Sequence, residues 1–209
     1  MTRSIIDNQL EKLPKEIKFC ARCVVSNQRP RIQFDENGVC GACAYTDIKN
    51  SIDWKTREKE LVKLCDLYRR NNGSFDVVVP TSGGKDSAVV SHKLKYKYGM
   101  HPLTITWAPF EYTRIGYQNF RDYIMEGGFN NLMAWQNGKL HKKLARLAFE
   151  SLGDAWQPFA YGQMSYAFHI AKAFDIKLVF FGENGEAEYS GDPRVYNLKG
   201  MPFDIWAEQ

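Results

Sequence analysis

The chain has 209 residues, of which 44% are hydrophobic and 14% aromatic, so it can bury a sizeable core and its composition excludes a disordered polymer. Its formal charge of +4 at pH 7 is mildly basic, which suits an anionic small substrate and equally suits ordinary solubility. The first residues mix acids and bases without an apolar core, and no stretch approaches the roughly 18 apolar residues of a membrane span. We therefore expect a cytoplasmic protein with no signal peptide and no membrane partner.

Residues 1–50 contain four of the five cysteines, in two close pairs. Cys20, Cys23, Cys40 and Cys43 have the spacing C-x2-C-x16-C-x2-C. In a reducing compartment this pattern indicates a metal rather than disulfides, because each pair fits a tight turn and four thiolates can surround one Zn²⁺. A site closed by four thiolates has no position for water, so we expect structural zinc. The alternative is a redox-active pair, which requires a C-x-x-C at the start of a helix in a thioredoxin-like unit.

A linking amphipathic helix is expected within residues 51–74. Over residues 53–70, apolar side chains recur at helical spacing with charged residues between them. Cys65, the remaining cysteine, falls on this apolar stripe. We interpret it as a core residue rather than as a reactive thiol.

From residue 75 onward, short apolar segments alternate with helical patterns. The expected strands are 75–80, 102–107, 130–135 and 176–182, and the expected helices are 87–99, 116–126, 139–153 and 163–174. Strands that are apolar throughout, joined by helices, predict an α/β domain with a doubly wound parallel sheet over residues 75–209. Residues 1–50 then form a zinc-ribbon-like appendage. Since such sheets bind ligands at the carboxyl ends of their strands, residues 80–87 and 182–188 should face one site.

The first expected strand runs into the sequence T-S-G-G-K-D-S, residues 81–87. A strand–loop–helix with two glycines and two serines presents backbone N–H groups and the positive end of a helix to an anion. It is not a Walker loop, because Val79 and Asp86 stand where that motif needs glycine and serine or threonine. The plainer alternative is an ordinary glycine turn between a strand and a helix.

In this context S-G-G-K-D-S resembles the pyrophosphate loop of the ATP-pyrophosphatase superfamily. These enzymes cleave ATP between its α- and β-phosphates and place AMP on a carbonyl oxygen, and a nitrogen or sulfur nucleophile then displaces the AMP. The resemblance implies binding of ATP and Mg²⁺ by the loop residues Ser82, Gly83, Gly84, Lys85, Asp86 and Ser87. Asp86 would help to bind Mg²⁺ and the serines and glycines would hold pyrophosphate. Lys85, at the variable position, would add positive charge.

A second polar segment, GENGEAEYSGD, follows the last expected strand and carries Glu183, Glu186 and Glu188. Carboxylates at the carboxyl edge of a sheet, opposite a phosphate loop, can bind Mg²⁺ or accept a proton from an attacking amine. A solvated acidic turn is the plainer alternative. We take Glu183 and Glu186 as catalytic candidates beside Lys85 and Asp86, and the spacing does not separate the metal role from the proton role.

Four segments together resemble the N-acetyl sugar amidotransferase family: CARCVVSNQRPRIQFDENGVCGAC, VVPTSGGKDS, TITWAP and FFGENGEAEY. The resemblance runs from Phe19 onward. It implies an enzyme that converts the acetamido group of a nucleotide-linked sugar to an acetamidino group, in the synthesis of bacterial surface polysaccharide or flagellar glycan. ATP would activate the amide oxygen as an adenylate, and ammonia would attack the same carbon. Members of the family continue well beyond the end of this sequence, so the match covers part of such a protein.

The ammonia source is expected on another chain. An amino-terminal nucleophile glutaminase needs Cys directly after Met1, where Thr2 stands, and the sequence has no G-x-C-x-G nucleophile elbow. The family resemblance implies a separate glutaminase subunit as partner, with a cyclase-like subunit as an ammonia conduit.

Two other functions stay open. A tRNA-modifying enzyme such as a thiolase would share the order of zinc site and loop, yet no cysteine follows Cys65 and no basic run is present to follow a phosphate backbone. A non-catalytic zinc-ribbon module that binds nucleic acid would explain the cysteines and leave S-G-G-K-D-S without a role. We therefore expect a nucleotide-linked sugar, and no nucleic acid, as the partner.

Overall fold

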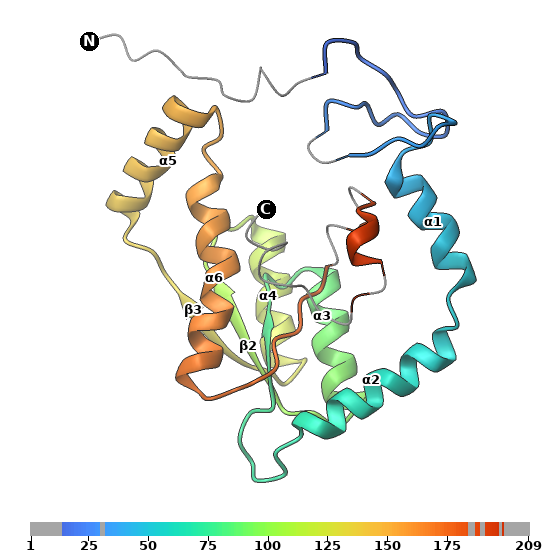
Figure 1. Cartoon of the computed structure of the whole chain (residues 1–209). Helices are drawn as coiled ribbons and strands as arrows, with labels where there is room; N and C mark the ends of the chain where they lie inside the picture. Colours follow the sequence, from blue (N-terminus) through green and yellow to red (C-terminus); the bar gives the residue numbers. More distant parts are fainter. Residues whose placement is uncertain (1–13, 30–31, 184–186, 189–190, 197, 199–209) are drawn as a thin grey trace. The chain divides into compact units, whose positions relative to one another are not determined.

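Figure 1 shows the structure of the chain, a computed structural model. It describes residues 14–29, 32–183, 187–188, 191–196 and 198. The chain divides into two compact units, a larger one with residues 55–183 and a smaller one with the described parts of 7–54 and 184–209. The residues after 183, which we expected in the sheet domain, are thus grouped with the cysteine-containing unit.

The larger unit is built on a sheet of three parallel strands in the spatial order β1-β2-β3. They are β1 (Val77–Pro80), β2 (Pro102–Trp107) and β3 (Asn130–Ala134). The register pairs Val78 with Leu103, and Ile105 with Leu132. These strands fall where the apolar segments predict them.

Residues 178–180 lie along the other side of β1. The N–H of Val78 donates to Leu178 O at 2.9 Å, and the N–H of Phe180 donates to Val78 O at 2.9 Å, which makes one parallel bridge between Val78 and Val179. The strand expected over 176–182 is reduced to this bridge, since these two are the only backbone hydrogen bonds that join it to the sheet among the described residues. The direction in which strands are added to the sheet therefore reverses at β1, with β2 on one side and residues 178–180 on the other. Such a reversal is the switch point at which open α/β sheets bind ligands.

Helices connect and cover the strands of the larger unit. They are α2 (Trp54–Tyr68), α3 (Lys85–His92) with the π-helical turn η2 (Lys93–Lys97), α4 (Arg114–Met125), α5 (Gly138–Leu152) and α6 (Gln157–Ala173).

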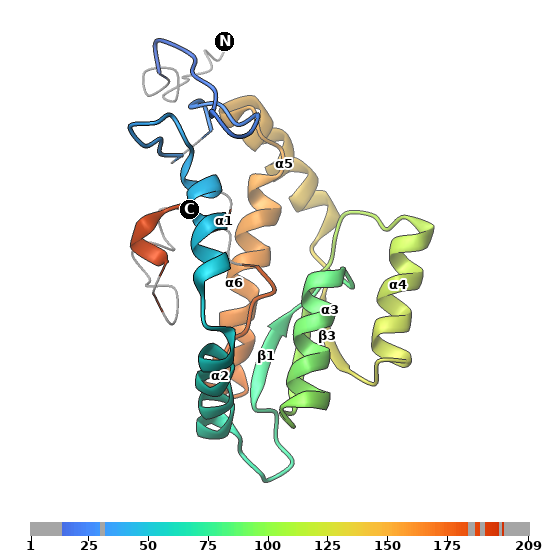
Figure 2. The same cartoon turned by 90° about the vertical axis from the view of Figure 1, so that its right-hand side faces the viewer.

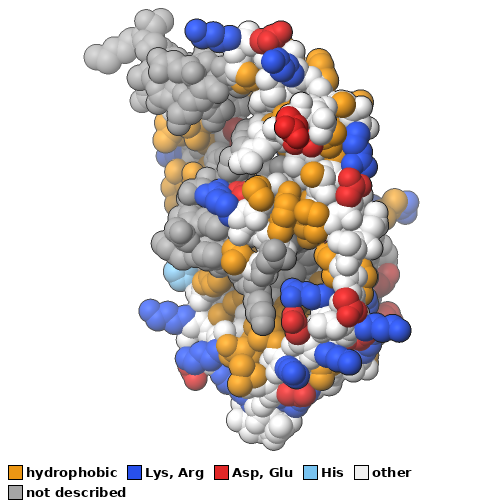
Figure 3. All heavy atoms as spheres, turned by 45° about the vertical axis from the view of Figure 1, so that its right-hand side comes forward, with side chains coloured by type: hydrophobic (Ala, Val, Ile, Leu, Met, Phe, Trp, Pro, Cys, Tyr) orange, Lys and Arg blue, Asp and Glu red, His pale blue; other side chains and the backbone are white. Residues whose placement is uncertain are grey.

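On the face that carries α2, Figure 3 shows basic and acidic side chains interspersed. Within the part of the chain that the structure describes, no helix combines the length and the apolar character needed to cross a membrane.

The helix bounds differ from the predicted ones mainly at the amino ends. α4 begins two residues early, because the side chain of Thr113 caps it by accepting the N–H of Gly116. α6 begins six residues early, with proline in its first turn, where a missing N–H breaks no helical bond. α5 ends as predicted at Gly153, whose φ of 72° suits a glycine cap.

The sheet is covered on both faces by apolar clusters. Val77 and Val79 pack with Cys65 of α2, whereas Val78 faces the other way and packs with Ala167 of α6. Figures 1 and 2 both show β1 between α6 and α3. Cys65 is fully buried, so its interpretation as a core residue is confirmed. A parallel sheet covered in this way confirms the expected α/β class.

The smaller unit combines the cysteine region, α1 (Gly41–Ser51) and described residues after 186. Tyr45 of α1 stacks on Tyr196 with ring centroids 4.9 Å apart. Ala187 and the 3-10 helix η4 (Pro193–Val195) complete this cluster. Residues far apart in the sequence therefore share one small core.

Candidate functional site

The S-G-G-K-D-S sequence forms the turn between β1 and α3. Gly83 has a φ of 81°, in the left-handed region that favours glycine. A Cβ at Gly83 would lie 2.7 Å from Cα of Phe120 in α4, so a side chain does not fit there. Gly84 is the N-cap of α3. The turn therefore places the positive end of α3 at the carboxyl edge of the sheet.

The first turn of α3 offers unused hydrogen-bond donors. Among the described residues, the N–H groups of Gly84, Asp86 and Ser87 have no acceptor. This is the ordinary state of a helix start, where an anion can accept such N–H groups. The N–H of Gly83 differs, because it donates to Thr81 Oγ1 at 3.1 Å. One of the donors expected to face an anion is thus already used inside the loop.

The two charged side chains of the loop lie against each other. Lys85 Nζ is 2.7 Å from Asp86 Oδ1, and the two side chains are 86% and 50% exposed. An ion pair this exposed contributes little to folding stability. It can therefore open at small cost when Asp86 or Lys85 takes another partner.

The hydroxyl groups of the loop are not equivalent. Ser82 is exposed, whereas Ser87 is half-buried and its Oγ lies 2.9 Å from Thr81 Oγ1. Thr81 is only 7% exposed. It was not among the predicted site residues, because it precedes the motif and its bonds depend on how the turn folds.

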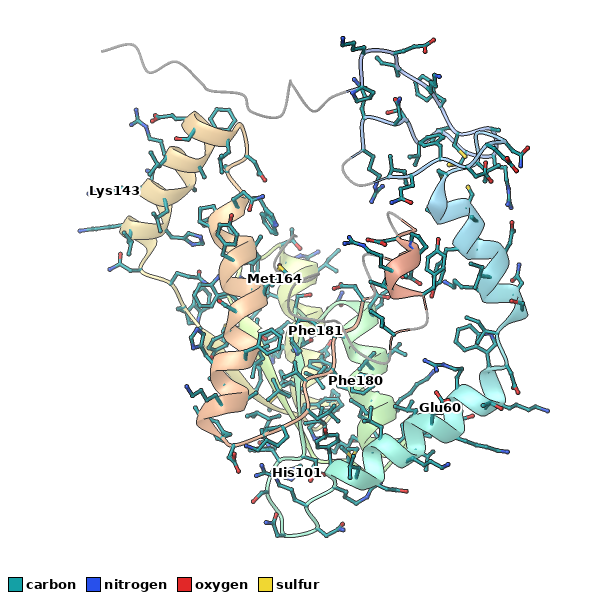
Figure 4. All side chains as sticks on the ribbon, in the orientation of Figure 1. Glu60, His101, Lys143, Met164, Phe180 and Phe181 are labelled. Atoms are coloured by element: carbon teal, nitrogen blue, oxygen red, sulfur yellow. The ribbon has the colours of Figure 1, made fainter. Side chains whose placement is uncertain are left out.

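The chain returns to the loop after the bridge at Val179. A Cβ built on Gly182 would lie 2.9 Å from the backbone nitrogen of Ser87, so the main chain at Gly182 packs against the first turn of α3. Phe180 and Phe181, labelled in Figure 4, belong to the clusters on opposite faces of the sheet. The structure thus brings Gly182 and the exposed Glu183 to the edge that carries the loop.

The other acidic candidates are placed differently. Glu186 lies outside the described residues. Glu188 belongs to the smaller unit, where its Oε1 lies 2.9 Å from Nζ of Lys49 in α1. This pair raises the pKa of Lys49, chiefly through the hydrogen bond from Lys49 to Glu188. Glu188 therefore has a structural partner inside its own unit.

The four predicted metal ligands come together. The Sγ atoms of Cys20, Cys23, Cys40 and Cys43 all lie within 4.8 Å of one another, and all four are free thiols. The distance is 4.0 Å from Cys20 to Cys43 and 3.7 Å from Cys23 to Cys40. A Zn–S bond of about 2.3 Å puts the sulfurs of a tetrahedral site about 3.8 Å apart. Figure 4 shows the sulfur atoms gathered beside the start of α1.

Backbone donors already favour the thiolate of Cys20. The N–H groups of Arg22 and Cys40 lie 3.3 and 3.2 Å from its Sγ. Desolvation opposes ionisation of Cys20, but these backbone donors outweigh it and lower the pKa to about 6. Desolvation raises the pKa of Cys43 to about 12. Holding all four groups as thiolates thus calls for a positive charge, which a bound Zn²⁺ would supply.

A hollow of about 710 Å³ lies between α2 and η2. It is lined by Lys55, Glu58, Lys59, Val62, Lys63, Lys97 and Tyr98. Glu58 pairs with Lys97 at 2.5 Å, and this contact lowers the pKa of Glu58. The lining therefore has four lysines against one glutamate. The sequence gives no basic run here, because the lysines come from two segments that only the fold brings together.

No protein-family model matches the chain. The chain is 26% identical over 87 residues to the uncharacterized protein MJ1599 of Methanocaldococcus jannaschii, which covers 41% of this chain and 31% of that protein. The chain therefore spans about a third of this curated relative.

Two solved structures are similar in fold. The NH3-dependent NAD synthetase from Campylobacter jejuni, in complex with nitrate, is 16% identical with a TM-score of 0.51, over 69% of this chain and 63% of that chain. The NMN synthetase from Francisella tularensis is 18% identical with a TM-score of 0.48, over 65% and 57%. The likeness to the first structure shows the α/β fold, and the chain spans less than two thirds of either synthetase chain.

Proposed function

We propose that the chain is the ATP-binding part of an N-acetyl sugar amidotransferase within the ATP-pyrophosphatase superfamily. The observation that carries this proposal is the loop itself. S-G-G-K-D-S lies at the switch point of the sheet, with unused N–H groups on Gly84, Asp86 and Ser87. The likeness in fold to the synthetase from Campylobacter jejuni also supports the proposal, since that protein is named as ammonia-dependent.

The loop residues divide the work of binding ATP in this proposal. The N–H groups at the start of α3 and the hydroxyls of Ser82 and Ser87 donate to the β- and γ-phosphates. Asp86 contributes a carboxylate to Mg²⁺, which neutralises phosphate charge when bound. Lys85 leaves Asp86 and moves to the phosphates, because both partners of that exposed pair gain stronger contacts.

The reaction forms one bond and breaks another at each of two steps. The amide oxygen of the acetamido group attacks the α-phosphorus of ATP, and pyrophosphate leaves. Ammonia then attacks the activated carbon, the bond from carbon to the AMP oxygen breaks, and an acetamidino group and AMP result. In this proposal the exposed carboxylate of Glu183 accepts the proton that the attacking ammonia loses. Ammonia comes from a separate glutaminase subunit, with a cyclase-like subunit as the conduit.

The test is a reaction of the protein with ATP, Mg²⁺, ammonium and a panel of nucleotide-linked acetamido sugars. Mass spectrometry should show replacement of one oxygen by NH on one sugar, and the nucleotide products should be AMP and pyrophosphate. A matched panel of sugars without the acetamido group should stay unchanged. An unmodified panel, at protein concentrations that bind ATP, would contradict the sugar acceptor.

The four cysteines have a structural role in the same proposal. They hold one Zn²⁺, and the small cluster around Tyr45 gives the unit few other apolar contacts. Binding of the metal then supplies much of the folding free energy of the smaller unit.

The lysine-lined hollow favours a second candidate, a tRNA-modifying enzyme of the same superfamily. Lys55, Lys59 and Lys63 stand four residues apart on α2, about 6 Å apart along the helix, so they form a row. Binding of tRNA through this row should weaken as salt rises, and Lys59→Gln with Lys63→Gln should reduce the salt slope by about 2. Tight tRNA binding with that dependence, and no conversion of any sugar, would favour this candidate over the first.

A further inference from the structure

Thr81 connects three parts of the site through one buried residue. Its backbone N–H donates to Ile105 O at 2.8 Å, which ties it to β2. Its Oγ1 accepts the N–H of Gly83 at 3.1 Å and lies 2.9 Å from Ser87 Oγ. The sheet, the turn and the first turn of α3 are thus joined at a residue that is 7% exposed.

The chemistry of a hydroxyl group limits these bonds. A hydroxyl has one proton and two lone pairs, and Gly83 already uses a lone pair of Thr81. Thr81 Oγ1 keeps a second lone pair, so either hydroxyl can donate in its contact with Ser87 Oγ. When Thr81 donates, the proton of Ser87 is left with Gly84 O among the described residues, at 3.3 Å, which is long for a bond between hydroxyl and carbonyl. In that arrangement the Ser87 proton is available to a stronger acceptor.

A second set of bonds fixes the main chain of Ser87. Its carbonyl accepts the hydroxyl of Ser91 at 2.7 Å, and Ser91 is fully buried. The hydroxyl of Tyr123 in α4 donates to Ser91 Oγ at 2.7 Å. Desolvation raises the pKa of Tyr123, so this donor stays protonated. With its main chain held from α4, Ser87 can change little except the direction of its hydroxyl.

We propose that Thr81 is a positioning residue for pyrophosphate. It holds the turn at Gly83 and directs the Ser87 proton toward a phosphate oxygen at the start of α3. This inference rests on the proposed function only in that the loop binds pyrophosphate, and the acceptor sugar does not enter it.

The test uses calorimetric titration of magnesium pyrophosphate into the full chain. Thr81→Val keeps the shape and removes the hydroxyl, and we expect a roughly tenfold weaker affinity, about 1.4 kcal/mol. Thr81→Ser keeps the hydroxyl and should stay within about twofold of the parent. Ile105→Val shortens a buried apolar side chain on β2. It should lower Tm about as much as Thr81→Val does and leave the affinity for pyrophosphate unchanged.

A double substitution separates positioning from general support. If Thr81 acts through Ser87, then Thr81→Val should have little further effect in a Ser87→Ala background, since coupled residues are not additive. Additive losses, a Thr81→Ser variant as weak as Thr81→Val, or a Thr81→Val that changes Tm alone would each overturn the proposal. So would a parent chain that does not bind pyrophosphate. Intact pyrophosphate affinity without sugar conversion would contradict the proposed acceptor and leave Thr81 in its role.

Discussion

Gly182 packs directly against the backbone nitrogen of Ser87, since a Cβ on Gly182 would lie 2.9 Å from that atom and 3.1 Å from the carbonyl carbon of Asp86. Gly182 follows the segment that bridges to β1, and Ser87 lies in the first turn of α3. The end of the bridged segment and the start of the helix that follows β1 are therefore in contact at the switch point. Glu183 leaves this contact with its side chain exposed beside the loop.

Gly182→Ala tests this contact. The new methyl group must displace backbone, so we expect a loss of about 1–3 kcal/mol in the free energy of unfolding and a weaker affinity for ATP. Gly138→Ala is the matched control, because a Cβ at Gly138 has nothing within 4 Å. Chemical denaturation and ATP titration measure both effects. Equal behaviour of the two variants would show that Gly182 does not lie against α3.

Lys85→Met removes the partner of Asp86 and keeps most of the side-chain length. We expect weaker binding of ATP, because a positive charge leaves the phosphate site, and saturation at a lower Mg²⁺ concentration, because Asp86 no longer pairs with Lys85. Lys139→Met, an exposed lysine at the start of α5, serves as control. Titrations of Mg²⁺ at fixed ATP measure the change. A higher Mg²⁺ requirement in Lys85→Met would contradict competition for Asp86.

Glu183→Gln tests the proton acceptor. Loss of a positioned base typically lowers the rate by about 10²–10⁴-fold, so acetamidino-sugar formation should fall in that range while ATP still binds. Glu126→Gln, an exposed carboxylate at the end of α4, should leave the rate unchanged. Glu186→Gln is made in parallel. Normal rates in both Glu183→Gln and Glu186→Gln, with folding intact, would mean that this acidic segment is only a solvated turn.

Cys40→Ser tests the metal centre. We expect loss of bound zinc and unfolding of the smaller unit, because Cys40 is fully buried among the other three thiols. Cys65→Ser, a buried cysteine of the larger unit, should lower Tm and keep the zinc. Metal analysis and circular dichroism measure the two properties. Undiminished zinc in Cys40→Ser would refute the four-thiolate site.

Local sequence patterns predicted most of the larger unit. β1, the loop and α3 follow one another in the chain, so the apolar run and S-G-G-K-D-S were enough to place them. The cysteine cluster was also predictable, because two residues between the cysteines of a pair keep their thiols close, in a loop for Cys20 and Cys23 and at the start of α1 for Cys40 and Cys43. Cys65 was predictable from its place on a helical stripe.

Features that depend on distant residues were not predictable. Tyr196 donates to Gly41 O at 3.3 Å, and no pattern in either segment announces that contact. The lysines of α2 and η2 line the same hollow because both helices pack beside β1. Thr81 precedes its motif as an unremarkable strand-end residue, and its role depends on the conformation of Gly83. Packing and hydrogen bonds between separate segments decide these features, and single-segment periodicity does not report them.

The central claim, that the loop binds pyrophosphate and that ATP is cleaved between its α- and β-phosphates, is tested most directly by identifying the nucleotide products. The protein is incubated with ATP, Mg²⁺, ammonium and acceptor sugar, and the products are separated by chromatography. We predict AMP and pyrophosphate, with both nearly absent in Asp86→Asn at unchanged Tm. ADP and phosphate as products, or full activity of Asp86→Asn, would contradict the account.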